Sequence, residues 1–272
     1  MLPEWKYNWA SSIKFLLLKL SRIIKFSQNI NLLDNRIEVF MTFSRAVDDA
    51  IEFYGISRED FFDNVLKWNV TEKNLFNQAE NLKQFYESWN NEASIQNVCA
   101  NIINQMIWIE NYNICSRYAI SSDFIIDYGC GTGSLSIGLA FNKKIKNKLL
   151  LLDVPNDVSK FRDRRISKYN LTNVKNENIF EYDVLDKSDL LICLDVLEHL
   201  ENSSFVFINH ICPLLKSGGF MILRAPWRGQ LTHIDQAADD FYLNGGRKYL
   251  SKYFREVYRL GMEDIHCVYQ KK

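Results

Sequence analysis

Proline and glycine are scarce in the first part of this sequence. Residues 1–120 contain one glycine, Gly55, and one proline, Pro3, whereas the rest of the chain contains ten glycines and three prolines. Both residues favour turns and interrupt helices, so their scarcity predicts an all-helical region and their later frequency predicts many short elements. We therefore expect a helical domain over residues 1–120 and an α/β domain over residues 121–272.

The sequence also lacks a charge excess, a metal-like cysteine pattern and a membrane-spanning run. Its 33 basic and 33 acidic residues balance, so no nucleic-acid partner is expected. Six cysteines without a CxxC pair fit reduced thiols and a cytoplasmic location. Four basic residues interrupt the apolar run 13–26, which therefore cannot span a bilayer. We expect a helix with a buried apolar face there, and a helix lying on a membrane surface is the alternative.

Helices are predicted along most of the first region. Gly55 is expected just after one helix, and Ser57 and Thr71 are expected to be N-caps of others. Apolar residues at 3/4 spacing give the last helix a clear hydrophobic face. The many aromatic residues fit either a domain core or the lining of a substrate pocket. The predicted helices are 11–27, 32–54, 57–68, 71–90 and 92–119.

The second region alternates between strand and helix patterns. Such alternation predicts a Rossmann-like, seven-stranded, mostly parallel sheet with helices on both faces. Ligands of these sheets bind at the carboxyl ends of the strands. The predicted strands are 124–127, 148–152, 178–182, 189–194, 220–224, 256–260 and 265–270, and the predicted helices are 134–141, 156–169, 203–215 and 247–254.

A glycine-rich turn separates the first of these strands from the first helix. Asp127 is followed by Gly129, Gly131 and Gly133. Glycines at alternate positions let the backbone approach a ligand, and the following helix start offers free amides. The third glycine comes one residue earlier than in the dinucleotide fingerprint Gly-x-Gly-x-x-Gly, which disfavours a nucleotide-dependent oxidoreductase.

Four consecutive predicted strands end in an aspartate: Asp127, Asp153, Asp183 and Asp195. Aspartate is common in turns, but the carboxyl ends of parallel strands share one edge. Four carboxylates on that edge suit a ligand rich in hydrogen-bond donors and poor in phosphate. The loop has no P-loop lysine, which agrees with such a ligand.

The glycine loop with its preceding carboxylate resembles motif I of the class I S-adenosylmethionine-dependent methyltransferases. Residues 215–219 resemble the family's Leu-Lys-Pro-Gly-Gly turn, with Ser217 in place of proline. The resemblance covers most of residues 120–272 and implies S-adenosylmethionine as the cofactor. It also implies four groups of cofactor-binding residues: Asp127, Gly129, Cys130 and Gly131 for the methionine part; Asp153 and Val154 for the ribose; Asp183 and the amide of Val184 for adenine; and Leu194 and Asp195 beside the sulfonium.

Catalytic candidates follow the fourth and fifth predicted strands. His199 could act as a general base, and His233 and Asp235 could orient one another or the substrate. The alternative is a structural helix start and a surface loop. Residues 195–199, Asp-Val-Leu-Glu-His, are also similar to the Glu-x-x-Glu-His motif of magnesium-dependent small-RNA methyltransferases. A divalent ion held with His233 therefore stays open, although we assign no metal ligand.

The sequence thus predicts methyl transfer to a small molecule, with residues 1–120 as a helical cap over the acceptor. The two histidines lead us to favour oxygen over nitrogen or carbon as the acceptor atom. A protein or RNA methyltransferase and a non-enzymatic cofactor-binding protein are the alternatives. A homodimer is left open.

Overall fold

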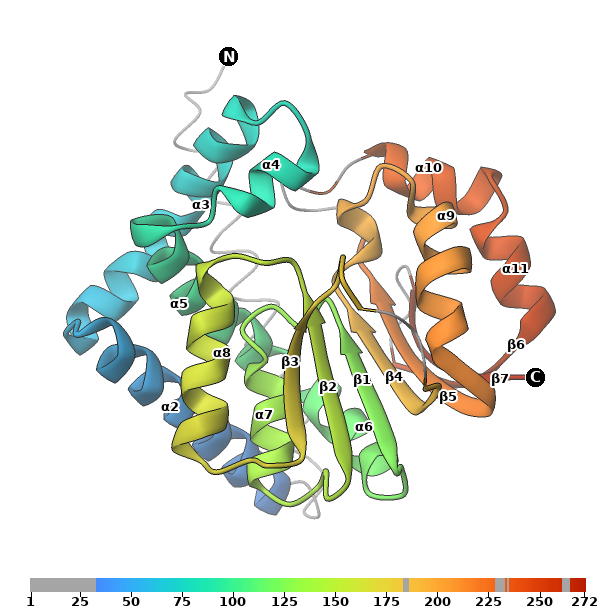
Figure 1. Cartoon of the computed structure of the whole chain (residues 1–272), viewed down its shortest axis with the longest axis horizontal. Coiled ribbons are helices and arrows are strands. Elements are labelled where there is room, and N and C mark those ends of the chain that lie inside the picture. Colours follow the sequence, from blue (N-terminus) through green and yellow to red (C-terminus); the bar gives the residue numbers. More distant parts are fainter. Residues whose placement is uncertain (1–32, 183–185, 228–232, 234, 261–264) are drawn as a thin grey trace.

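The computed structural model describes residues 33–182, 186–227, 233, 235–260 and 265–272 (Figure 1). A seven-stranded sheet at its centre has the order β3-β2-β1-β4-β5-β7-β6. Strands β3, β2, β1, β4 and β5 are parallel, and β7 runs antiparallel between β5 and β6. The strands are β1 (Phe124–Tyr128), β2 (Lys148–Asp153), β3 (Val174–Asn178), β4 (Ser188–Leu194), β5 (Leu215–Ala225), β6 (Phe254–Arg259) and β7 (Ile265–Lys271). The predicted Rossmann-like sheet is confirmed.

Helices cover both faces of this sheet, and successive strand residues alternate between the two cores. Ile125 belongs to one hydrophobic cluster and Ile126 to the other. A strand buried on both faces needs such a continuous apolar run. The first face carries α7 (Ser134–Phe141) and α8 (Asp157–Lys168), and the second carries α9 (Ser203–Val206), α10 (Asp235–Leu243) and α11 (Gly246–Tyr253).

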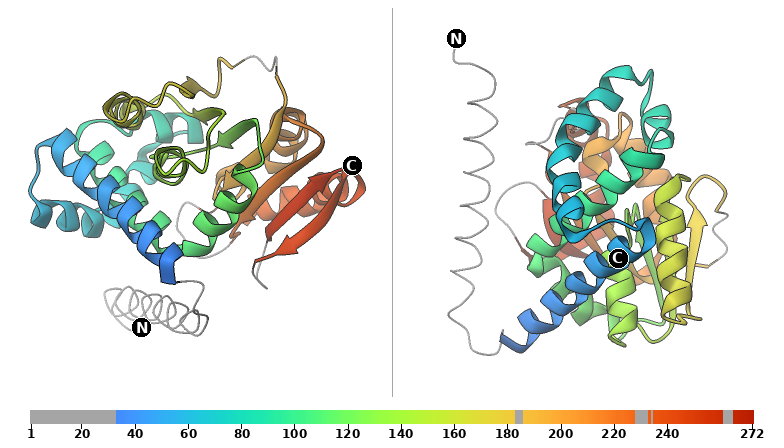
Figure 2. Two further views of the ribbon diagram at one scale, coloured as in Figure 1. Left: turned by 90° about the horizontal axis from the view of Figure 1, so that it is seen from below. Right: turned by 90° about the vertical axis from the view of Figure 1, so that its left-hand side faces the viewer.

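The described N-terminal helices lie on the α7–α8 side of the sheet, away from α9–α11 (Figure 2). Val39 and Ile102 share one hydrophobic cluster with Leu149 and Ile192 of the sheet. The core therefore continues across residue 120, and the division into cap and catalytic domains stays a prediction. These helices are α2 (Leu33–Tyr54), α3 (Arg58–Gln78), α4 (Leu82–Glu87), α5 (Asn91–Ile107) and α6 (Ile109–Ala119).

Helix boundaries in this region follow the caps in part. Gly55 adopts φ +63° after α2, and Ser57 forms a capping box at the start of α3, as predicted. Thr71, however, lies inside α3, so the prediction of a new helix there is wrong. The predicted helix 92–119 is divided at Trp108 into α5 and α6. The predicted helix 11–27 lies outside the described residues.

Two predictions in the second region are also wrong, and one helix was missed. Strand β3 ends at Asn178 rather than spanning 178–182, because it is a half-exposed edge strand with little hydrophobic signal, while Ile179 and Tyr182 pack beyond its end. The predicted helix 203–215 becomes α9, a π-helical turn (Phe207–Ile211) and a 3₁₀ turn (Cys212–Leu214). Helix α10 was not predicted.

Candidate functional site

The glycine loop joins β1 to α7 at the carboxyl edge of the sheet. Gly129, Gly131 and Gly133 have φ of +69°, +56° and +63°, a region that side chains disfavour. A Cβ on Gly129 would lie 2.4 Å from Cγ2 of Val196. The amides of Gly129 and Cys130 donate to the Leu152 carbonyl, so the loop is tied to β2.

Asp153 ends β2 and braces this loop. Its carboxylate accepts hydrogen bonds from the amides of Gly131 and Val154. Arg162 of α8 donates to the Gly131 carbonyl through Nη1 and to Asn176 through Nε. Burial raises the pKa of the Asp153 carboxyl group, while Arg162 and the two amides oppose that shift. Asp153 therefore lies where the sequence placed it, with its carboxylate against the loop.

Asp127 lies inside β1 and is 5% exposed. The hydroxyl of Ser136 donates to its Oδ2 at 2.6 Å. Burial is the main cause that raises the pKa of Asp127 to about 7. The hydrogen bond from Ser136 and the charge of Arg162 lower this pKa, while the negative charge of Asp153 raises it. Because the pKa of Asp127 lies near neutral pH, a cationic ligand at this position would stabilise its charged form.

Asp195 directly follows β4 and has the left-handed φ of +59°. Nη1 of Arg224 lies 2.5 Å from its Oδ2. The Arg224 guanidinium in turn lies 3.6 Å from the centre of the Trp108 ring, at the break between α5 and α6. Two distant segments therefore hold Asp195 in a backbone conformation that non-glycine residues rarely adopt.

Glu198, His199 and His233 converge beyond the end of β4. One ligand atom from each of the three lies within 4.8 Å of the others. Nε2 of His199 is 3.9 Å from Oε1 of Glu198, and the two imidazole rings are 5.0 Å apart. Glu198 is fully buried. The structure thus joins two segments that the sequence analysis could associate only by resemblance, and it places Asp195 with Arg224 instead.

Several predicted site residues cannot be placed in this way. Asp183 and Val184 lie outside the described residues, as does the side chain of Asp235. Since β3 ends at Asn178, residues 179–182 form no strand, and the prediction that a strand leads into Asp183 is wrong. Leu194 is the half-buried last residue of β4 and precedes Asp195 at the edge.

The N-terminal helices also contribute side chains to this edge, which was not predicted from the sequence. Asn101 and Gln105 of α5 hydrogen-bond to the glycine loop and to the start of α7. Burial and then the charges of Glu198 and Asp153 raise the pKa of Tyr86 in α4. The sequence feature that could have indicated this role is the spacing of Asn101 and Gln105, which are four residues apart beside the apolar face of the predicted helix 92–119.

The chemistry of these residues fits the expected cofactor. Asp127 and Asp153 supply buried carboxylates for cationic and hydroxyl donors, and the glycine loop supplies a close backbone surface. No lysine lies within the loop Gly129–Gly133. The arrangement suits a phosphate-free nucleoside with a positive charge.

Comparisons with known proteins agree with this chemistry. Residues 126–221 match the family model described as a methyltransferase domain. No curated protein matches the chain. Among solved structures, similar folds include the N-methyltransferase NodS from Bradyrhizobium japonicum WM9, in complex with S-adenosyl-L-homocysteine, with 15% identity, TM-score 0.43, and coverage of 74% of this chain and 98% of that one. An O-methyltransferase family protein from Burkholderia thailandensis has 13% identity and TM-score 0.48, covering 77% and 71% respectively. An rRNA methylase from Streptococcus thermophilus has 16% identity and TM-score 0.43, covering 60% and 94%.

The family match includes the end of β1, the glycine loop, β2 and β4, which contribute to the carboxyl edge described above. Residues 126–221 of this chain are therefore similar to a methyltransferase domain, and they lie in a sheet with the strand order described above.

Proposed function

We propose that this enzyme methylates an oxygen atom of a small molecule at the carboxyl edge of β4. The observation that carries the proposal is the convergence of Glu198, His199 and His233 just beyond the end of β4. Two imidazoles next to the expected sulfonium position can take a proton from a hydroxyl group. Methyl transfer to a nitrogen or carbon atom would explain the presence of two neighbouring imidazoles less well.

The reaction would be an in-line displacement, for which bound S-adenosylmethionine supplies an electrophilic methyl group. The loop Gly129–Gly133 and Asp153 would hold the cofactor, and Asp127 would favour its cationic end. His199 or His233 would accept the hydroxyl proton as the new bond forms. Much of the rate in such reactions comes from alignment and from exclusion of water, so a catalytic triad is not required.

Tyr86 supports a small acceptor. It belongs to α4, which lies above the carboxyl edge of the sheet (Figure 1), and it interacts electrostatically with Glu198 and Asp153. Helix α4 of the helical region thus lies at the same edge of the sheet as the glycine loop. A partly covered site suits a small molecule better than a polymer, and a balanced net charge argues against RNA. All six cysteines are buried free thiols, which supports a cytoplasmic location.

Cofactor binding and turnover test this proposal. Isothermal titration calorimetry should detect S-adenosylhomocysteine binding, and hydroxylated metabolites should be screened for S-adenosylhomocysteine release. His233→Ala should leave cofactor binding unchanged and lower turnover by about a hundredfold, the usual scale of acid–base catalysis. Absence of cofactor binding would refute the proposal, and unchanged turnover would return His233 to a surface role. Cofactor binding without any acceptor would favour a non-enzymatic role.

The same three residues could hold a divalent ion that binds the acceptor oxygen. Two imidazoles and one carboxylate suit manganese, iron or zinc better than magnesium, which prefers oxygen ligands. We expect a chelator to lower activity, and manganese or zinc to restore it. Glu198→Gln should reduce metal content measured by mass spectrometry while cofactor binding persists. Full activity in the presence of chelator would assign the histidines to proton transfer alone.

A further inference from the structure

Helix α7 begins with a residue that cannot cap it. Its N-cap is Gly133, which adopts φ +63° and has no side chain to accept a hydrogen bond. The first amides of any helix need partners from outside that helix. At this helix those amides also border the cofactor loop, so their partners influence the shape of the binding site.

A neighbouring helix provides the missing cap. Oε1 of Gln105, on α5, accepts a hydrogen bond from the amide of Leu135 at 3.0 Å, and Leu135 is the second residue of α7. One turn earlier on α5, Oδ1 of Asn101 accepts from the Thr132 hydroxyl at 2.8 Å. Gln105 Nε2 donates to the same Asn101 oxygen at 2.9 Å, which fixes the two amide groups relative to each other.

Asn101 also limits the space around the loop. A Cβ placed on Gly131 would lie 3.2 Å from Nδ2 of Asn101. The amide of Gly131 donates to Asp153. The loop is therefore held between Asp153 of the sheet and Asn101 of the helical region.

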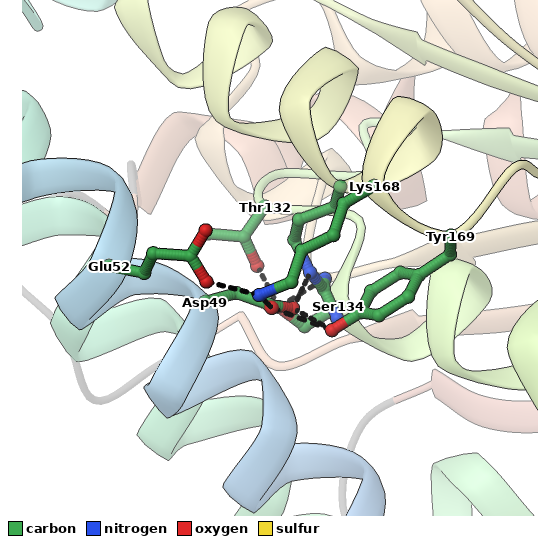
Figure 3. A network of polar contacts seen from close by, with 7 residues as sticks. Asp49, Glu52, Thr132, Ser134, Lys168 and Tyr169 are labelled. Carbon is green, nitrogen blue, oxygen red and sulfur yellow. Dashed lines mark hydrogen bonds and ion pairs between the residues drawn. The ribbon is translucent and has the colours of Figure 1, made fainter.

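A buried ionic network continues this support. Ser134 Oγ lies 2.8 Å from Thr132 Oγ1, and Nη1 of Arg165 lies 3.4 Å from Ser134 Oγ. Arg165 pairs with Asp49 of α2 at 2.9 Å. Figure 3 shows Asp49 and Glu52 close to Lys168, with Thr132 and Ser134 beside them. Helices α2 and α5 thus both reach the back of the cofactor loop.

We propose that Asn101 and Gln105 are positioning residues of the cofactor site, which hold the glycine loop and the first turn of α7 in the shape that binds S-adenosylmethionine. The proposal rests on the proposed assignment of this loop to the cofactor. It makes the N-terminal helices part of cofactor binding, in addition to any role over the acceptor.

Two substitutions at one position test the proposal. Gln105→Met keeps the length of the side chain but removes the acceptor, so the Leu135 amide loses its partner. Gln105→Glu keeps an acceptor for the Leu135 amide, and a negative charge is favourable at a helix N-terminus. Both substitutions remove the Nε2 donor to Asn101, so they differ in the acceptor. We expect Gln105→Met to weaken S-adenosylhomocysteine binding about tenfold, the scale of one lost buried hydrogen bond, and Gln105→Glu to remain within about threefold of the unaltered protein.

Calorimetry on the full chain measures these affinities, and Asn104→Ala is the matched control because Asn104 is exposed on the same helix. Hydrogen exchange at the start of α7 should be faster in Gln105→Met and unchanged in Gln105→Glu. In turnover assays, the KM for the cofactor should rise in Gln105→Met while kcat changes little.

Asp153→Asn separates the two hypotheses. If Asp153→Asn weakens binding but Gln105→Met does not, the positioning role is refuted and the cofactor site stands. If neither substitution changes binding, the assignment of the loop to the cofactor fails. Equal losses in Gln105→Met and Gln105→Glu would also overturn the positioning role, because the acceptor would then be irrelevant.

Discussion

At the scale of single residues, Asp127 has the most informative environment. Its side chain is buried at the carboxyl edge of the sheet, and burial is the main cause that raises its pKa to about 7. Because the folded pKa exceeds the unfolded value of 3.8, Asp127 contributes most to stability at acidic pH. That contribution is lost as the pH rises through about 7. A bound cation would lower the pKa of Asp127 again, because it would stabilise the carboxylate.

We predict that cofactor binding is linked to the protonation of Asp127. The cationic cofactor should lower the pKa of this carboxyl group, so binding below about pH 7 should release a proton. Affinity for S-adenosylmethionine should therefore rise between about pH 5.5 and 7 and then level off. Calorimetry in two buffers of different ionisation enthalpy measures the released proton. The same proton release from Asp127→Asn would show that another group is responsible.

At the scale of elements, α3 shows how a helix start depends on more than residue type. Ser57 and Thr71 are both residue types that favour the N-cap position, yet only Ser57 is an N-cap, and α3 continues through Thr71. At Ser57 the capping box is completed by Asp60, which accepts from the Ser57 amide at 3.0 Å while its own amide donates to the Ser57 hydroxyl. The reciprocal bond decides between the two positions.

We predict different effects for the two alanine substitutions. Ser57→Ala should lower the free energy of unfolding by about 1 kcal/mol, because it removes a cap. Thr71→Ala should change it by less than about 0.5 kcal/mol or stabilise the protein slightly, since alanine favours a helix interior. Thermal and urea unfolding measure both. A larger loss at Thr71 than at Ser57 would contradict this assignment of the helix start.

At the scale of the whole molecule, a buried ion pair joins the N-terminal helices to the α/β part of the chain. Asp49 of α2 and Arg165 of α8 are 3% and 1% exposed. Burial raises the pKa of Asp49, but Arg165, Tyr169 and Lys168 together hold it below its usual value. Asp49 precedes residue 120, and the charged groups that pair with it, Arg165 and Lys168, both follow residue 120.

We predict that Asp49→Ala lowers the free energy of unfolding by about 3 kcal/mol, because it leaves the Arg165 guanidinium buried without its carboxylate. Glu52→Ala, one turn away on α2, should cost much less than Asp49→Ala, since Glu52 is half-exposed and its ion pairs are screened by solvent. Urea unfolding of the full chain measures both. Similar losses for the two variants would show that the buried pair does not join the regions.

The sequence by itself determined the sheet and the position of the glycine loop and Asp153 at its carboxyl edge. Buried strands such as β1 and β2 carry continuous apolar runs, and the glycine loop and Asp153 follow them directly in the chain. Their positions therefore depend on local pattern and covalent order. The half-exposed edge strand β3 lacks such a pattern, so its residues were misplaced.

Only the tertiary structure decided which side chains meet at that edge. Asp195 pairs with Arg224, and His199 lies beside His233, across sequence separations that no local pattern encodes. Gln105 caps α7 from another helix because Gly133 cannot. Such contacts depend on how helices pack on the sheet, and packing is set by the whole chain rather than by any one segment.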